Sequence, residues 1–133
     1  GNRAADLELK FAEMNGWEAE SNAAQLLQNL GVKEELHDKL MSELSNTEKV
    51  RVMLAKALFG KPENLLLDEP TNNLDPASRE EILHALYSYE GAVVLVTHDP
   101  GAVTALAPER VLVLPDADED LWDDSYLDLV TLT

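Results

Sequence analysis

The sequence predicts an α/β fold in which a helical half precedes a parallel sheet. Helical spacing of apolar residues dominates the first 60 residues, whereas short apolar runs alternate with helical patterns after residue 61. This alternation gives the order βαβαβ, which is typical of parallel strands joined by right-handed crossovers. We therefore expect two domains, a helical subdomain over residues 1–60 and an α/β core over residues 61–133.

The helical half is expected to open with two helices within residues 3–30. Leu7, Phe11 and Met14 fall on one face of the first helix, which gives that helix an apolar stripe. A further short helix is expected over residues 32–40, where leucine and valine recur at helical spacing.

The next helix is expected to begin at Ser45. Ser45 and Glu48 have the spacing of a capping box, in which the hydroxyl and the carboxylate satisfy amides of the first turn. The same helix amino-terminus is also suited to bind a phosphate group. An ordinary capped helix is the alternative that this spacing leaves open.

The α/β half contains two carboxylates at the end of its first strand, where Leu65-Leu66-Leu67 runs directly into Asp68-Glu69. Carboxylates at the carboxyl end of a buried parallel strand lie where α/β sheets bind ligands. Asp68 is suited to hold Mg²⁺ directly or through water, and Glu69 to orient or deprotonate an attacking water. Strands are expected at 64–68, 92–97 and 110–114, helices at 77–89 and 100–106, a polar loop at 115–124 and a last helix at 125–132.

The strand expected at 92–97 is followed by His98. Because neighbouring parallel strands end at the same edge of a sheet, we expect His98 to lie close to Asp68 and Glu69. Asp75 stands before Pro76, in the position of a helix N-cap.

Three stretches resemble motifs of ATP-binding cassette (ABC) ATPases, in the order that this family has them. LLLDEPTNNLD at 65–75 resembles the Walker B motif and the D-loop, and its wording is most similar to the ABC-F branch, soluble twin-cassette proteins that act on ribosomes. LSNTE at 44–48 stands where the family has its LSGGE signature, and the strand before His98 resembles the H-loop. The resemblance implies a helical subdomain followed by a partial RecA-like parallel sheet.

The same resemblance implies a role for each matching residue. Asp68 would support the metal, Glu69 would be the catalytic glutamate and His98 would contact the γ-phosphate. Asn46 and Thr47 replace the two glycines of the signature, so their side chains are expected to hinder close approach of a phosphate. The implied nucleotide-binding residues are Ser45, Asn46, Thr47 and Glu48, with Asp75 coupling the nucleotide sites of two cassettes.

The chain contains no Gly-x-x-x-x-Gly-Lys motif. Such a P-loop supplies the amides, the lysine and the hydroxyl that hold the β- and γ-phosphates. We therefore expect the carboxyl-terminal part of one cassette, truncated or chimeric, that hydrolyses almost no ATP alone although the intact parent uses Mg·ATP. The expected partners are a second cassette or missing amino-terminal half and, by resemblance, the ribosome. Two alternatives stay open: a non-catalytic or engineered scaffold or interaction module, and an ATPase fragment of an ABC transporter.

The composition limits the other classes of function. Ten basic and 26 acidic residues give a net charge of −16, which argues against nonspecific nucleic-acid binding by this chain. The chain has no cysteine, and no apolar run reaches the roughly 18 residues of a membrane span. We expect a cytoplasmic protein. Because parallel strands need cover on both faces, we expect either a rearranged docking of residues 3–58 onto the sheet or self-association through an exposed sheet edge.

Overall fold

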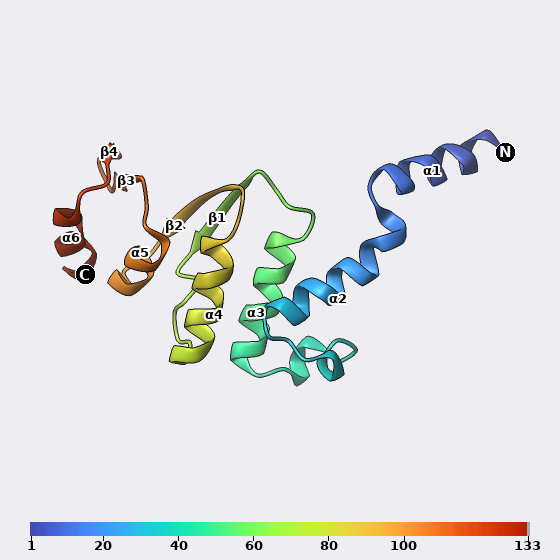
Figure 1. The fold of residues 1–133 in the computed structure, drawn as a ribbon, viewed down its shortest axis with the longest axis horizontal. Helices are drawn as coiled ribbons and strands as arrows, with labels where there is room; N and C mark the ends of the chain where they lie inside the picture. Colours follow the sequence, from blue (N-terminus) through green and yellow to red (C-terminus); the bar gives the residue numbers. More distant parts are fainter. Residues whose placement is uncertain (133) are drawn as a thin grey trace. The chain divides into compact units, whose positions relative to one another are not determined.

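The computed structural model describes residues 1–132, a mixed α/β chain (Figure 1). Its internal contacts divide the chain into two compact units, Gly1–Phe59 and a second unit that begins at Gly60. The first is helical, and the second contains all the strands of the described residues.

The first unit consists of three α-helices and three short 3-10 helices. The helix expected over 32–40 is shorter than predicted, because only a 3-10 turn forms there. The elements of the first unit are α1 (Asn2–Glu13), η1 (Gly16–Glu18), α2 (Ala19–Asn29), η2 (Glu34–Leu36), η3 (Met41–Glu43) and α3 (Asn46–Leu58).

The core of the first unit lies where α2 packs on α3. Leu30 and Val32 follow α2 and are buried, as are Leu54 and Leu58 of α3. Arg51 of α3 donates from Nη1 to the carbonyls of Leu30 at 3.2 Å and Gly31 at 3.0 Å, which ties the end of α2 to α3. Leu30 is the C-cap of α2, so the first of these contacts satisfies a carbonyl that the helix end leaves unpaired.

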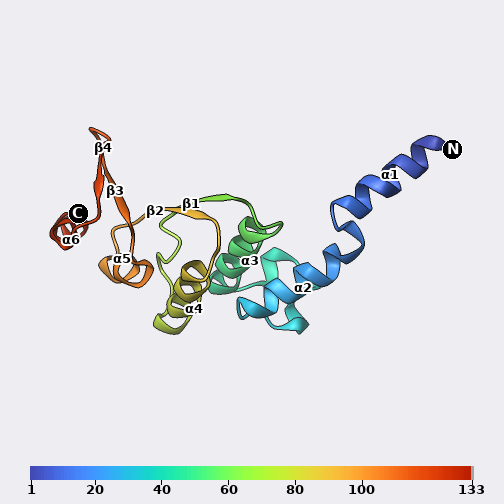
Figure 2. The same ribbon diagram turned by 45° about the horizontal axis from the view of Figure 1, so that its top comes forward.

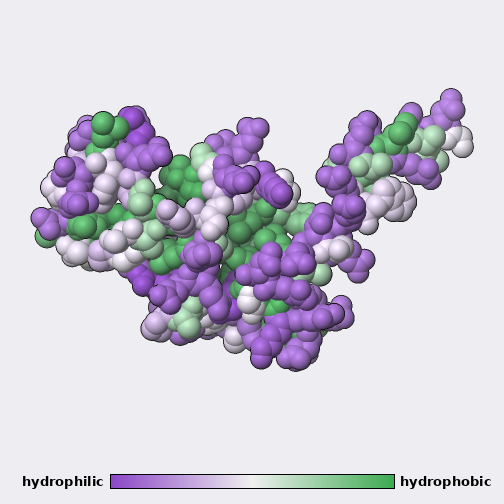
Figure 3. All heavy atoms as spheres, in the orientation of Figure 1, coloured by the Kyte–Doolittle hydropathy of each residue, from purple (hydrophilic) through white to green (hydrophobic). Residues whose placement is uncertain are grey.

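Helix α1 buries none of its residues. Leu7, Phe11 and Met14, the stripe that the sequence indicates, are 58%, 45% and 80% exposed. Phe11 packs edge-on against Trp17, with 4.8 Å between the ring centroids. Figure 3 shows hydrophobic and hydrophilic residues together on the surface of this helix.

The second unit is built on two parallel strands, β1 (Asn64–Asp68) and β2 (Ala92–Val96). Helices α4 (Pro76–Tyr87) and α5 (Pro100–Leu106) follow these strands, and both lie on the same side of them in Figures 1 and 2. The remaining elements are β3 (Arg110–Val113), β4 (Asp118–Leu121), η4 (Asp124–Tyr126) and α6 (Leu127–Thr131).

The two faces of the β1–β2 pair differ in burial. Leu65 is buried on the side of the helices, with a core that α4 and α5 supply from Ile82, Leu83, Leu86, Ala102 and Val103. On the other face Leu66, Val94 and Val96 are 72%, 55% and 41% exposed. Figure 3 shows hydrophobic residues at the surface over these strands. The parallel sheet is therefore covered on one face only in this unit.

The third expected strand does not join this parallel sheet. β3 pairs antiparallel with β4, in a register that sets Arg110 opposite Leu121. Residues 118–121, expected within a polar loop, therefore form a strand. Acidic residues disfavour strands by intrinsic preference, but cross-strand pairing overrides that preference here. Arg110 Nε contacts Glu119 Oε1 across this hairpin at 2.6 Å.

Among residues 1–132, no helix combines the length and the apolar character that crossing a membrane requires.

Candidate functional site

The ends of β1 and β2 bring Glu69 and His98 together. The amide of Glu69 donates to the carbonyl of Val96 at 2.8 Å, so the ladder continues one residue beyond Asp68. Glu69 then adopts a φ of 45°, in the left-handed region that side-chain-bearing residues rarely occupy. Such backbone costs about 1–3 kcal/mol and is concentrated at functional sites. The strand thus stops abruptly at a glutamate.

Three contacts fix the carboxylate of Glu69. Oε1 accepts a hydrogen bond from the amide of His98 at 3.1 Å and lies 3.6 Å from the imidazole Nε2. Oε2 accepts from the hydroxyl of Thr97 at 3.5 Å. The carboxylate is 29% exposed and the imidazole 65%, so the pair faces solvent at the strand ends.

Asp68 ends β1 with its side chain exposed. Described residues 1–132 contain no group of three or more side chains arranged to hold a metal ion. A single carboxylate nevertheless suits Mg²⁺, which commonly binds one or two protein carboxylates and takes its other ligands from water and phosphate oxygens. The exposed carboxylate of Asp68 is thus a ligand of the kind that Mg²⁺ takes from proteins.

Asp75 caps α4, as the sequence predicts. Its Oδ2 accepts from the amide of Ser78 at 3.1 Å, and its Oδ1 accepts from the Ser78 hydroxyl at 2.6 Å. Pro76 occupies the first turn of the helix, where its missing N–H costs nothing.

The capping box at the start of α3 is confirmed. The amide of Glu48 donates to Ser45 Oγ at 3.3 Å, and the amide of Ser45 donates to Glu48 Oε2 at 2.7 Å. Hydrogen bonding to the backbone amide of Ser45, and then to its side chain, lowers the pKa of the Glu48 carboxyl. Asn46 and Thr47 lie in the first helical turn. These four residues belong to the first unit, whereas Asp68, Glu69, Asp75 and His98 belong to the second.

Asp99 belongs to none of the motifs in the sequence, yet it is bonded to a neighbouring helix. Arg79 of α4 donates to its carboxylate from Nε at 2.6 Å and from Nη2 at 2.7 Å. Hydrogen bonding to the Arg79 guanidinium lowers the pKa of Asp99. The sequence Asp99-Pro100-Gly101 signals a helix cap, but no local pattern links position 99 to an arginine on another helix.

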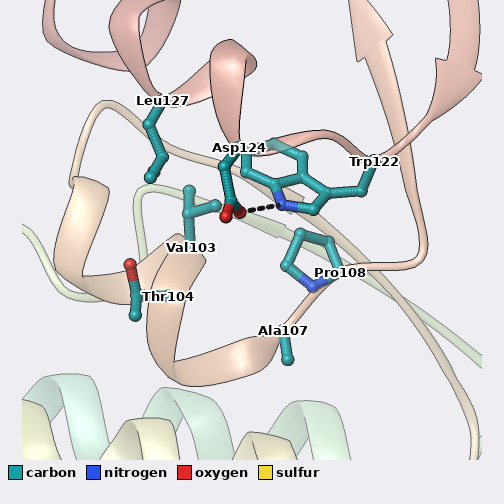
Figure 4. Close-up of a pocket in the computed structure, with 7 residues that line it drawn as sticks. All are labelled: Val103, Thr104, Ala107, Pro108, Trp122, Asp124 and Leu127. Atoms are coloured by element: carbon teal, nitrogen blue, oxygen red, sulfur yellow. Dashed lines mark hydrogen bonds between the residues drawn. The ribbon is translucent and has the colours of Figure 1, made fainter.

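A surface hollow of about 340 Å³ lies elsewhere in the second unit (Figure 4). Trp122 donates from its indole Nε1 to Asp124 Oδ1 at 3.4 Å along its wall. None of the candidate site residues lines this hollow. Its walls are formed by Val103, Thr104, Ala107, Pro108, Trp122, Asp124 and Leu127.

Comparison with known protein families identifies the chain. The family model described as ABC transporter matches residues 2–72. The chain belongs to the ABC transporter ATPase family. A second model, described as an AAA domain, matches residues 46–104 of this cassette segment.

Two curated relatives match about three quarters of the cassette segment. The uncharacterised ABC transporter ATP-binding protein YkpA of Bacillus subtilis is 57% identical over 99 residues, which are 74% of this chain and 18% of YkpA. The probable ATP-binding protein YbiT of Escherichia coli O157:H7 is 43% identical over 99 residues, which are 74% of this chain and 19% of YbiT. The segment thus spans less than a fifth of the length of either relative.

The fold is that of solved ABC cassettes. The cassette MJ0796, in a dimeric post-hydrolysis state bound to ADP and Pi, is 30% identical, with a TM-score of 0.66 over 76% of this chain and 46% of that one. This likeness confirms the α/β fold class predicted from the sequence.

Proposed function

We propose that this chain is the carboxyl-terminal part of an ATPase cassette and that Glu69 is its hydrolytic carboxylate. The observation that carries the proposal is the position of Glu69, where the amide of His98 and the hydroxyl of Thr97 contact one carboxylate at the strand ends. Carboxyl ends of parallel strands are where α/β folds bind ligands. Membership of the ABC family supports Mg·ATP as the ligand of the intact protein.

Each strand-end residue has its own task in this proposal, and Glu69 and His98, which are in contact, act as one catalytic unit. Glu69 orients the attacking water or takes its proton, because a carboxylate within hydrogen-bonding reach of a water can act as a general base. His98 donates to the γ-phosphate from its exposed imidazole. Asp68 supports Mg²⁺, which when bound neutralises charge on the phosphate oxygens. This division of roles follows the family motifs and agrees with the exposure of these side chains.

The first unit and Asp75 would act at a second cassette. Ser45, Asn46, Thr47 and Glu48 lie at the start of α3, an end of a helix that favours anions. Ser45 and Glu48 are already bonded to each other in the capping box, which supports a weak phosphate contact at this signature. The dimeric form of MJ0796 supports a second cassette as partner. The proposed domains are a helical subdomain over residues 1–60 and an α/β core over residues 61–133.

We propose further that the intact parent is a ribosome-associated protein of the ABC-F class, on the basis of the LLLDEPTNNLD wording. The alternative of a transporter ATPase is supported by the description of the matching family and by the name of YkpA. The alternative of a non-catalytic module is supported by the lack of a P-loop motif in these 133 residues. Co-sedimentation of the intact parent with ribosomes, with and without ATP, separates the first two.

Phosphate release from Mg·ATP tests the proposal. The 133-residue chain alone is expected to release phosphate at the background rate. A complete cassette that carries these residues should hydrolyse ATP, and Glu69→Gln should lower its rate about 100-fold or more, the usual contribution of a general base. Glu109→Gln, a matched change at an exposed glutamate of the same unit, is the control. Turnover that Glu69→Gln leaves unchanged would refute the assignment.

A further inference from the structure

Four side chains of the second unit lie beside the Glu69–His98 pair: Thr71, Arg79, Thr97 and Asp99, called here the Asp99 cluster. The Asp99 carboxylate accepts two hydrogen bonds from Arg79 of α4, at 2.6 and 2.7 Å, and one from the hydroxyl of Thr71 at 3.3 Å. Thr71 is buried, with 6% of its surface exposed. Asp99 therefore joins the loop after β1 and the helix α4 to the end of β2.

The Asp99 cluster also reaches Glu69. The amide of Asp99 donates to Thr97 Oγ1 at 3.0 Å, and the same hydroxyl donates to Glu69 Oε2 at 3.5 Å. His98 lies between Thr97 and Asp99 in the chain, and its own amide donates to Glu69 Oε1. The backbone that presents His98 is thus held on both sides.

Gly101 makes room for this arrangement. A Cβ at position 101 would overlap Nη2 of Arg79 and would lie 3.2 Å from Asp99 Oδ1. The amide of Gly101 also donates to Asp99 Oδ1 at 2.9 Å. Because the atom in the way is the end of a flexible side chain, an alanine here would displace the guanidinium at little cost to the fold.

We propose that Asp99 is a positioning residue that, held by Arg79 and Thr71, fixes residues 97–99 so that the His98 amide stays on the Glu69 carboxylate. The catalytic consequence rests on the proposed function, whereas the positional claim is tested without nucleotide. A competing explanation is that Asp99 merely caps α5. Loss of Asp99 would then loosen α5 but leave the rate of hydrogen exchange at the His98 amide unchanged.

Amide hydrogen exchange of the 133-residue chain, measured by NMR, distinguishes these explanations. In Asp99→Asn and in Gly101→Ala, exchange of the His98 amide should be about tenfold faster, the factor expected when one ordinary hydrogen bond is lost. Glu119→Gln breaks the matched Arg110–Glu119 pair on the β3–β4 hairpin and should leave His98 exchange within about twofold of the parent.

The amides of Leu67 and Val94, which face the partner strand in the parallel ladder, serve as the reference for global opening. The proposal requires His98 exchange to rise more than theirs in both variants. It is overturned if His98 exchange stays unchanged, or if all three amides accelerate together, because Asp99 would then act only on the stability of the fold. Failure of the proposed function is a separate result: hydrolysis that survives Glu69→Gln would leave these exchange rates as they are.

Discussion

Glu69 Oε1 lies 3.1 Å from the amide nitrogen of His98 and 3.6 Å from its imidazole Nε2. The parallel register, which pairs Asp68 with Val96, sets the next residues of both strands at one edge of the sheet. A slip of one residue would exchange the two faces of a strand, and burial of Leu65 opposes that slip. The hydrophobic pattern of the strands therefore also fixes the geometry of the candidate site.

His98→Ala should impair hydrolysis without impairing folding. In a complete cassette that carries this segment, loss of one donor to developing charge should lower kcat about 100- to 1,000-fold. Because the imidazole is 65% exposed, the free energy of unfolding measured in urea should differ between variant and parent by less than about 0.5 kcal/mol. His84→Ala, at an exposed histidine of α4, is the control. Normal turnover in His98→Ala would remove this residue from the mechanism.

The lowered pKa of Asp99 gives a pH dependence of stability. The folded state favours the ionised carboxylate through Arg79, so the stabilisation is present above the ordinary aspartate pKa of 3.8. It is lost as the pH falls through the lower pKa of the folded state. Urea unfolding followed at Trp122 should show the parent converging on Asp99→Asn as the pH falls below about 4. A stability difference between them that is constant down to pH 2 would contradict this cause.

Ser45→Ala should destabilise the first unit. The variant loses the hydroxyl that accepts the amide of Glu48, and N-cap losses of this kind cost about 1 kcal/mol. Helical circular dichroism during urea unfolding measures the change. Ser42→Ala, at an exposed serine three residues earlier, should alter the midpoint little. Equal effects of the two substitutions would mean that the capping box contributes nothing measurable.

The exposed face of β1 and β2 should drive self-association. The side chains of Leu66 and Val94 are 72% and 55% exposed. Replacing both by threonine should therefore weaken association while the free energy of unfolding changes little. Leu65→Ala on the buried face should instead cost about 2–5 kcal/mol. Light scattering across a concentration series measures association. A parent chain that stays monomeric throughout would refute this prediction.

The sequence predicts the parts of this molecule that depend on local patterns. The apolar runs at 64–68 and 92–97 give β1 and β2, and the spacing of Ser45 and Glu48 gives the capping box. The convergence of Glu69 and His98 follows from the parallel order and from the register that the apolar pattern fixes. These features require only neighbouring residues or the rule that parallel strands end at one edge.

Features that depend on how one element contacts another escape prediction from the sequence. Strand β4 is rich in acidic residues and forms because β3 pairs with it. The apolar stripe of α1 predicts burial, yet this helix buries nothing within its unit. The contact of Arg79 with Asp99 joins residues 20 positions apart on different elements, and no spacing rule indicates it.

The central claim, that Glu69 and His98 act as one unit, is tested most directly by single-turnover hydrolysis of Mg·ATP. The samples are complete cassettes that carry this segment with Glu69→Gln, His98→Ala or both. Residues that act together give non-additive losses, so the double variant should be no slower than the slower single variant. Losses that multiply in the double variant, or a Glu69→Gln cassette that hydrolyses ATP at the parent rate, would contradict the claim.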